Sequence, residues 1–289
     1  MTDRTLVMGA VAYAPKVVTI WEGFKAYFAT RGLAFDYVLY SNYERQVEAQ
    51  FEGGIDLAWN SPLAWLRAER MARARGVQVS AVAMRDTDCD LTSVLVVRTD
   101  RSKGGIETVA DLRGRTVGFG AVDSPQATLI PADHLRQAGL VGGRDYTVRI
   151  FDVLGGKHGD HVGGELDAAK ALVAGEIDAA WMIDGNHLAF SSDGTLPAGQ
   201  TRVLARTAPF DHCNFTVSPG ASAEPVARFT ELLLGMRWDD PVVRPLLELE
   251  GLRQWRVGRT VGYAALARAV DDEGFYDVSG NITARDYRY

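Results

Sequence analysis

FEGGIDLAWN (residues 51–60) and VAGEIDAAWMID (residues 173–184) share one local pattern. In each stretch the end of an amphipathic segment and a small turn precede the letters I-D-x-A-W, which are typical of a short buried strand. The same helix–turn–strand unit therefore occurs once in each half of the chain. We predict two lobes of similar construction rather than one continuous sheet.

The segments around both copies alternate between strand and helix patterns. The predicted strands are residues 5–13, 34–40 and 55–59 in the first series, and 115–120, 146–153 and 177–184 in the second. The predicted helices are residues 17–31, 43–52 and 62–75, a segment ending near residue 140, and residues 166–174. This order predicts an α/β fold with a parallel sheet in each lobe. Such sheets bind ligands at the carboxyl ends of their strands.

Composition and charge exclude several classes of protein. The chain has 289 residues, enough for two lobes, and is 47% hydrophobic and 24% charged, as in an ordinary soluble protein. A net charge of −6 without a basic stripe argues against a nucleic-acid partner. Two cysteines, Cys89 and Cys213, are too few for a disulfide framework.

The N-terminal residues carry no recognisable targeting signal. MTDRTLVMGAVAYAP has an acidic residue at position 3 and lacks the basic and apolar regions of a secretory leader. No run approaches the ~20 apolar residues of a membrane span. We expect a cytoplasmic protein that is complete as written; an export signal that was removed is the alternative.

Several stretches, taken together, resemble a known family. In order they are SNYERQVEAQFEGGIDLAWNSPLAW, SVLVVRTD, ETVADLRGRTVGFG, LIPADHLRQAGL and ALVAGEIDAAWMID. They are similar to the phosphonate- and phosphite-binding branch of type-II periplasmic binding proteins, over residues 5–235. The resemblance implies two Rossmann-like lobes with a central cleft and two hinge crossovers, near residues 91–98 and 212–218. Lobe one would comprise residues 1–92 plus 212–289, and lobe two residues 93–211.

The resemblance also implies which residues contact a ligand. In these binders, small hydroxyl residues at the start of a second-lobe helix cradle an oxyanion. The matching stretch here is AVDSPQATLIP (residues 121–131), in which Pro125 has no N–H, so a weaker site suited to a carboxylate is expected. A helix cap at Ser124 and nothing more is the alternative. The ligand-binding residues that we predict are Tyr13, Tyr43, Asn60, Ser61, Ser124, Gln126, Thr128, Asp184 and Asn186.

GGKHGDHVGGE (residues 155–165) adds titratable residues at the mouth of the predicted cleft. His158 and His161 suit proton transfer, because the unperturbed pKa of histidine lies near neutrality, and Asp160 would orient one imidazole. A solvated glycine-rich loop is the other interpretation. A metal site at His158, His161 and Glu165 is a weaker hypothesis, because a flexible H-x-x-H lacks a full ligand set unless His212 or Cys213 completes it.

His212 and Cys213 form a second cluster, on the returning crossover. We predict that they reach the floor of the cleft and join the catalytic set of His158, His161 and Asp160. A buried cysteine that only fills space is the alternative.

Three functions remain open. An absent export signal, a reduced hydroxyl cluster and added acid/base residues favour a cytosolic enzyme of the lyase or decarboxylase type, acting without a cofactor on a small anionic ligand. The alternative is the solute-binding component of an ABC importer, whose partner would be a membrane permease. An intracellular ligand sensor is a third reading.

Overall fold

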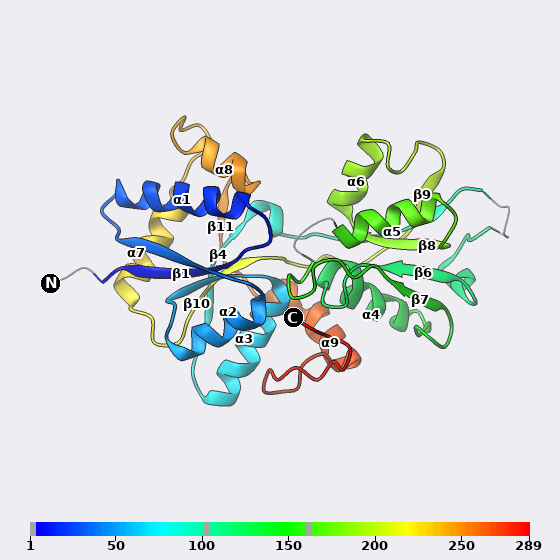
Figure 1. The fold of residues 1–289 in the computed structure, drawn as a ribbon, viewed down its shortest axis with the longest axis horizontal. Coiled ribbons are helices and arrows are strands. Elements are labelled where there is room, and N and C mark those ends of the chain that lie inside the picture. The colour runs from blue at the N-terminus through cyan, green and yellow to red at the C-terminus, as the bar shows by residue number, and fades with distance from the viewer. Residues whose placement is uncertain (1–3, 101–104, 160–162) are drawn as a thin grey trace.

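The computed structural model describes residues 4–100, 105–159 and 163–289, and within these residues the strands form two sheets (Figure 1). One sheet has the order β11-β4-β10-β3-β1-β2 and the other the order β7-β6-β8-β5-β9. The strands are β1 (Leu6–Val11), β2 (Phe35–Tyr40), β3 (Leu57–Asn60), β4 (Ser80–Arg85), β5 (Ser93–Arg98), β6 (Thr116–Phe119), β7 (Thr147–Ile150), β8 (Ala179–Ile183), β9 (Thr201–Arg206), β10 (Asn214–Val217) and β11 (Trp255–Val257). The predicted two-lobed α/β architecture is confirmed.

Both sheets are mixed, whereas the strand–helix alternation predicted parallel ones. β1 pairs in parallel with β2 and β3, and β6 with β7 and β8. β10 runs antiparallel to β3, with Asn214 opposite Asn60, and β5 runs antiparallel to β8, with Ser93 opposite Ile183. β5 and β10 each begin at the sheet edge where the parallel strands end, because the chain reaches that edge directly from the other sheet. Each crossing therefore reverses the strand direction.

The helices cover the sheets on both faces. They are α1 (Lys16–Ala29), α2 (Tyr43–Glu52), α3 (Pro62–Arg75), α4 (Ile130–Gln137), α5 (Gly163–Val173), α6 (Asp184–Ser192), α7 (Ala223–Leu234), α8 (Arg244–Glu250) and α9 (Ala264–Glu273), with the short turns η1 (Asp86–Asp88), η2 (Val109–Leu112), η3 (Pro125–Leu129) and η4 (Val261–Tyr263). None of the described helices combines the length and the apolar character that crossing a membrane requires.

Local signals explain why α2 and α3 begin and end as the sequence predicts. Asn42 and Ser61 cap the two helices by accepting hydrogen bonds from the backbone N–H groups of Arg45 and Ala64. Gly53 and Gly76 end them in the left-handed conformation, where a glycine avoids the strain of a side chain. Helix α5 instead begins three residues earlier than the predicted 166–174, at Gly163.

An aromatic cluster forms the core of the first sheet. Trp59 and Phe215 on the neighbouring strands β3 and β10 have ring centroids 4.7 Å apart, and Trp255 of β11 meets Phe215 at 5.4 Å. Phe24 of α1 joins Trp255 at 6.0 Å. Large rings of this kind bury much apolar surface, so this half of the molecule presents a firm wall to whatever lies at its strand ends.

Two linkers join the sheets, over residues 86–92 and 207–213. They run antiparallel, with Leu91 and Phe210 exchanging backbone hydrogen bonds of 2.8 Å. The stretches predicted as crossovers, 91–98 and 212–218, therefore consist mostly of the strand that each linker enters. The division into residues 1–92 plus 212–289 and residues 93–211 stays a prediction.

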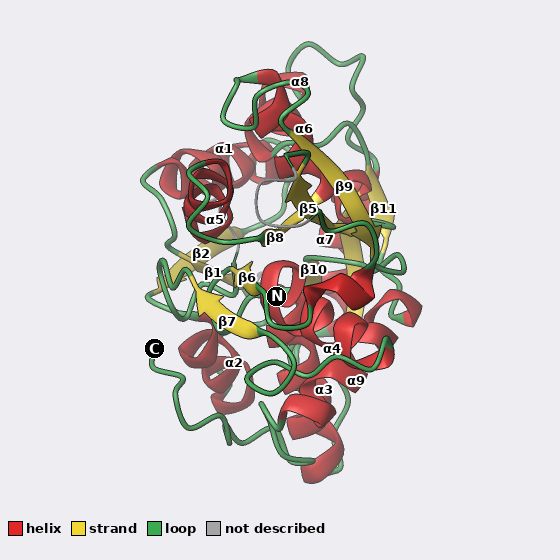
Figure 2. Ribbon diagram, turned by 90° about the vertical axis from the view of Figure 1, so that its right-hand side faces the viewer, coloured by secondary structure: helices red, strands yellow, loops and turns green. Residues whose placement is uncertain are grey.

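Helix α9 packs against both halves. It contacts α3 of the first half and α4 of the second, and Figures 1 and 2 both show it beside these two helices. Leu266 and Val270 of α9 share an apolar cluster with Leu66 of α3 and Ile130 of α4. The C-terminal segment thus closes the side of the molecule opposite α5 and α6.

Candidate functional site

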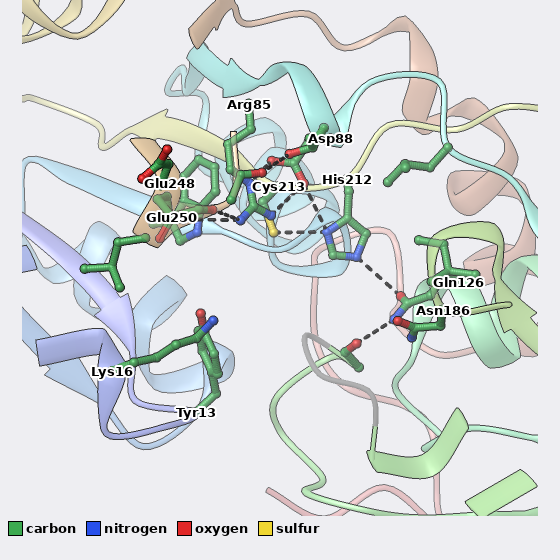
Figure 3. Close-up of a pocket in the computed structure, with 17 residues that line it drawn as sticks. Tyr13, Lys16, Arg85, Asp88, Gln126, Asn186, His212, Cys213, Glu248 and Glu250 are labelled. Atoms are coloured by element: carbon green, nitrogen blue, oxygen red, sulfur yellow. Dashed lines mark hydrogen bonds and ion pairs between the residues drawn. The ribbon is translucent and has the colours of Figure 1, made fainter. Parts of the chain in front are cut away.

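A cavity of about 470 Å³ lies between the two sheets and receives side chains from both (Figure 3). The first half contributes Tyr13, Lys16, Trp59, Arg85 and Glu250, and the second half contributes Gln126, Gly159 and Asn186. The linkers contribute Asp88, His212 and Cys213. The cavity thus occupies the position that open α/β sheets offer to a ligand, at the carboxyl ends of their strands.

Tyr13 and Lys16 form the outer wall on the first half. Tyr13 follows β1, and Lys16 is the first residue of α1, so the short turn between strand and helix presents both. The Lys16 ammonium lies 5.7 Å from the centre of the Tyr13 ring. No carboxylate pairs with this ammonium in the part of the chain that the structure describes. Lys16 therefore places a positive charge at the cavity with no described carboxylate paired to it.

Arg85, by contrast, is already committed to carboxylates. Its Nε and Nη2 donate to the two oxygens of Asp88 at 2.6 and 2.9 Å, and its Nη1 lies 3.3 Å from Glu250 Oε1. Burial raises the pKa of Asp88, but the Arg85 charge and its hydrogen bonds lower it more, to about 2. The guanidinium also lies 5.3 Å from the Trp59 ring. The Arg85–Asp88–Glu250 network thus fixes one guanidinium between two carboxylates in the wall.

His212 and Cys213 lie beside Asp88 on the returning linker, as the sequence predicts. His212 Nδ1 is 3.1 Å from Cys213 Sγ and 3.6 Å from Asp88 Oδ1. On the opposite side of the ring, His212 Nε2 is 3.4 Å from Gln126 Oε1, which belongs to the second half. Both side chains line the cavity. Cys89 does not line it; its Sγ donates to the Arg85 carbonyl at 3.4 Å.

Glu165 anchors the wall on the second half. Its Oε2 accepts hydrogen bonds from the Ile183 N–H at 2.9 Å and from Asn186 Nδ2 at 2.7 Å. Gln126 Nε2 donates to the Gly159 carbonyl at 2.5 Å and lies 3.3 Å from Glu165 Oε1. Complete burial raises the pKa of Glu165 despite these donors. Asn186 and Gln126 are thereby held at the cavity surface in one orientation.

Beside the cavity, the loop of residues 155–159 crosses from the second half and inserts His158 into the first. The imidazole is fully buried and stacks on the Tyr43 ring, with centroids 4.8 Å apart and planes 19° apart. Its Nδ1 is 2.6 Å from Ser61 Oγ and its Nε2 is 2.9 Å from Glu44 Oε1. We call these three interactions the His158 latch. The alternative of a solvated loop is therefore wrong for His158.

The hydrogen bonds of the latch define the tautomer of His158. Ser61 Oγ already accepts the Ala64 N–H at 3.1 Å, so its own proton is available for His158 Nδ1. The Nε2–H then donates to Glu44 Oε1, which also accepts from the Tyr276 hydroxyl at 3.2 Å. Burial raises the pKa of Glu44, but His158 and the hydrogen bonds outweigh it and the net pKa is lowered. Glu44 therefore stays ionised at neutral pH.

Backbone contacts hold the loop in place. Asp123 Oδ2 accepts from the N–H groups of Gly156 at 2.7 Å and His158 at 3.1 Å. Gly156 has φ of +82°, and a Cβ there would lie 2.9 Å from the Cβ of Asn42 in the first half. Lys157 Nζ donates to the carbonyls of Ala12, at 2.9 Å, and Ser41. The glycine is thus needed for the loop to approach the first half closely.

Comparison of the sequence with known protein families identifies the family of this chain. Residues 9–270 match the family described as ABC transporter, phosphonate, periplasmic substrate-binding protein. The chain belongs to this family. The resemblance that the sequence motifs carry is confirmed.

Solved structures agree on the fold. PhnD1 of Prochlorococcus marinus, in complex with methylphosphonate, superposes with a TM-score of 0.68 at 15% identity, over 94% of this chain and 98% of that one. XAC2383 of Xanthomonas citri, bound to ATP, gives 0.69 at 17% identity, over 93% and 97%. The periplasmic aliphatic sulphonate binding protein SsuA of Escherichia coli gives 0.57 at 19% identity, over 93% and 91%. The chain has the type-II periplasmic-binding-protein fold.

Membership in this family overturns two expectations. The prediction of a lyase or decarboxylase is wrong, because the family consists of solute-binding components of ABC transporters. The prediction of a cytoplasmic location is wrong for the same reason, because the family is described as periplasmic. The catalytic roles predicted for His158, His212 and Cys213 are withdrawn with the enzyme. Those predicted for Asp160 and His161 are withdrawn too, and both residues lie outside the described residues.

The predicted ligand contacts divide into two groups. Tyr13, Gln126 and Asn186 line the cavity, as do His212 and Cys213. The others do not line it: Tyr43 and Ser61 belong to the His158 latch, Asn60 bonds to Gln46 and Gln50, Ser124 caps Ala127, Thr128 donates to the Ala121 carbonyl, and Asp184 pairs with Arg206. Whether the cavity-lining residues bind the solute stays a prediction.

Sequence reasoning missed Lys16, Trp59, Arg85, Asp88 and Glu250. Two of these carried a signal, since Trp59 is the last aromatic of the IDLAW strand and Lys16 opens a helix just after Tyr13. Arg85 and Asp88 lie in MRDTDCD (residues 84–90), where the outgoing linker begins and where a charged cluster is more often solvent-exposed. Glu250 comes from α8, far along the chain, and no local pattern brings it to the cavity.

Proposed function

We propose that this protein is the solute-binding component of an ABC importer, and that it closes on a small organic oxyanion held in the 470 Å³ cavity. The observation that carries the proposal is the cavity itself, which is lined from both halves in a chain of this family. In PhnD1 the solved ligand is methylphosphonate, and SsuA is named for aliphatic sulphonates. Both ligand types present a tetrahedral oxyanion on a carbon.

We infer that the oxyanion lies near Lys16 rather than at Ser124. Beside Ser124, Gly159 and Glu165 only about 10 Å³ of space remains, which holds at most one water. The Ser124 hydroxyl is already used to cap Ala127. Lys16 lines the larger cavity with an ammonium that no described carboxylate neutralises.

The size and polarity of the cavity indicate the rest of the solute. A volume of about 470 Å³ lies in the range that holds drug-sized ligands and exceeds what a one-carbon phosphonate fills. Trp59 offers an apolar surface, and Asp88 and Glu250, which pair with Arg85, add carboxylates to the lining. We therefore propose a solute with an oxyanion at one end and a hydrogen-bond donor, such as an ammonium, at the other.

Calorimetric titration with a graded set of compounds tests this function. The set is methylphosphonate, a longer alkylphosphonate, an aminoalkylphosphonate, the matching sulphonates, and an aminoalcohol without an oxyanion. We expect the aminoalkyl oxyanions to bind most tightly and the aminoalcohol not to bind. Equal affinity for the aminoalcohol and the phosphonates would contradict the assignment of an oxyanion solute.

Lys16→Gln tests where the oxyanion lies. A hydrogen bond to a charged group contributes ~1.5–3 kcal/mol, so the variant is expected to weaken phosphonate affinity by ~10–150-fold. Lys25→Gln is the matched control, because Lys25 lies on the same helix and pairs with Asp36 at 2.8 Å outside the cavity. If both variants bind as tightly as the wild type, the oxyanion does not lie at Lys16.

A further inference from the structure

Three side chains on the two linkers present ligand atoms to one point on the cavity floor. Asp88 ends η1 on the outgoing linker, and His212 and Cys213 lie on the returning one. Their ligand atoms all lie within 4.8 Å of one another, and all three residues are buried. The His212 Nδ1 to Cys213 Sγ and Asp88 Oδ1 distances, 3.1 and 3.6 Å, resemble the ~3.3–3.8 Å edges of a tetrahedral zinc site with ordinary bond lengths.

The second half of the molecule fixes the tautomer of His212. Gln126 Nε2 donates to the Gly159 carbonyl at 2.5 Å, which turns Gln126 Oε1 toward His212. Oε1 is an acceptor, so His212 Nε2 carries the proton of the 3.4 Å contact. The lone pair of Nδ1 then points toward Cys213 and Asp88. A metal-bound histidine is usually held by a second contact of this kind.

Nearby charges favour a cation at this point. Arg85 holds Asp88 in a two-point ion pair, with its Nε and Nη2 at 2.6 and 2.9 Å from the two carboxylate oxygens. Arg85 takes one lone pair of each Asp88 oxygen, so Oδ1 retains a second lone pair for a metal. The Arg85 charge is itself offset by Glu250. A lone pair on Nδ1 that faces a carboxylate is unfavourable unless a proton or a cation lies between them.

We propose that Asp88 Oδ1, His212 Nδ1 and Cys213 Sγ form a binding site for a divalent transition metal, with Zn²⁺ as the preferred ion. One carboxylate, one imidazole and one thiolate suit Zn²⁺ better than Mg²⁺ or Ca²⁺, which favour oxygen ligands. The fourth position faces the cavity, which all three residues line, so a water completes the tetrahedron. The site does not depend on the proposed transport function, because the metal alone occupies it.

Backbone contacts hold the ligands in register before a metal arrives. The His212 N–H donates to the Asp88 carbonyl at 2.8 Å, and the Tyr263 hydroxyl donates to the His212 carbonyl at 2.8 Å. Zn²⁺ binding displaces the Cys213 thiol proton to solvent, so affinity rises with pH. A metal here also ties the two linkers together.

The test is equilibrium dialysis of the tag-free full chain against Zn²⁺, together with titration by Co²⁺ as a spectroscopic probe. We expect one Zn²⁺ per chain, and a Co²⁺ spectrum that has both the visible bands of a tetrahedral site and a thiolate charge-transfer band. Cys213→Ser is expected to remove the charge-transfer band and, like His212→Gln, to weaken Zn²⁺ binding by more than the ~10–100-fold typical of outer-shell changes.

Cys89→Ser is the matched control, because Cys89 is the other cysteine of the chain, lies on the same linker as Asp88 and does not belong to the cluster. It should bind Zn²⁺ like the wild type and keep the charge-transfer band. Thermal melts of each variant verify folding. The site is refuted if the wild type binds no Zn²⁺, if Cys89→Ser loses the band, or if folded His212→Gln retains wild-type affinity.

Discussion

Replacing His158 by alanine tests whether the loop of residues 155–159 holds the two halves together. The variant removes the stacking on Tyr43, the hydrogen bond from Ser61 and the hydrogen bond to Glu44 in one step. All three partners belong to the first half, whereas the loop extends from the second. The change therefore weakens a contact between the halves, and leaves the core of each intact.

The expected magnitude follows from these contacts. Aromatic stacking contributes ~0.5–1.5 kcal/mol, a neutral hydrogen bond ~0.5–1.5 and one to a charged group ~1.5–3 kcal/mol. When the two halves separate, Glu44, which is fully buried in the latch, is hydrated again. This favourable hydration offsets part of the lost interaction energy. We take ~2–3 kcal/mol as the net effect, which is ~30–150-fold in the ratio of closed to open molecules.

Two measurements report on this ratio. Small-angle X-ray scattering of the ligand-free protein is expected to give a larger radius of gyration for His158→Ala than for the wild type. Calorimetry is expected to show a weaker apparent affinity for the solute, by up to the same factor, because only the closed form binds fully. His187→Ala is the control, since His187 lies on α6, outside both the cavity and the latch.

The reasoning fails if folded His158→Ala matches the wild type both in scattering and in affinity. It also fails if the variant lowers the thermal midpoint strongly while the halves stay closed, because His158 would then stabilise one half rather than join two. A loss that His187→Ala shares equally would indicate a general effect of removing histidine.

Two further predictions concern the loop glycine and the buried ion pair. Gly156→Ala places a Cβ 2.9 Å from Asn42 Cβ at φ of +82°, so we expect solute affinity to fall by ~10-fold or more. Gly199→Ala is the control, because at φ of +75° with no atom within 4 Å it shares only the ~1–2 kcal/mol backbone strain and should keep its affinity. Equal solute affinities of the two variants in calorimetry would contradict this prediction. Asp88 has its pKa lowered from 3.8 to about 2, so its stabilisation is complete above pH 3.8 and is lost as the pH falls toward 2. In urea unfolding, the free energy of unfolding of the wild type should fall by ~2 kcal/mol more than that of Asp88→Asn between pH 4 and 2. Parallel pH profiles of the two proteins would refute this stabilising role of Asp88.

The fold was predictable where local chemistry decides it. Asn42, Ser61, Gly53 and Gly76 cap helices through contacts within a few residues, so α2 and α3 have the predicted ends. Strand direction was less predictable, because β10 pairs with β3 across more than half of the chain. The C-terminal helix α9, which packs on both halves, has no sequence signal for that position at all.

The site was predictable where it follows the ends of strands and the linkers. Tyr13 follows β1, Asn186 follows β8, and His212 lies between the sheets, so position along the chain already indicates the cleft. Glu250 and Arg85 meet there only because β11 pairs with β4, with Trp255 opposite Arg85. Such a long-range pairing determines the charge of the cavity wall, and no local sequence pattern predicts the pairing.

His158 shows why a catalytic pattern and a structural contact look alike in a sequence. A histidine between a serine hydroxyl and a carboxylate is the arrangement that activates a nucleophile, and Ser61, His158 and Glu44 reproduce it at 2.6 and 2.9 Å. Here, however, Ser61 Oγ already caps α3 by accepting the Ala64 N–H, and all three residues are completely buried.

A nucleophile needs space for the atom that it attacks, and none of these three side chains lines the cavity. The same polar groups instead satisfy one another, which is what a buried contact between two halves requires. What separates the two roles is the volume next to the hydroxyl. That volume depends on how the two halves dock, and the loop sequence GGKH does not predict it.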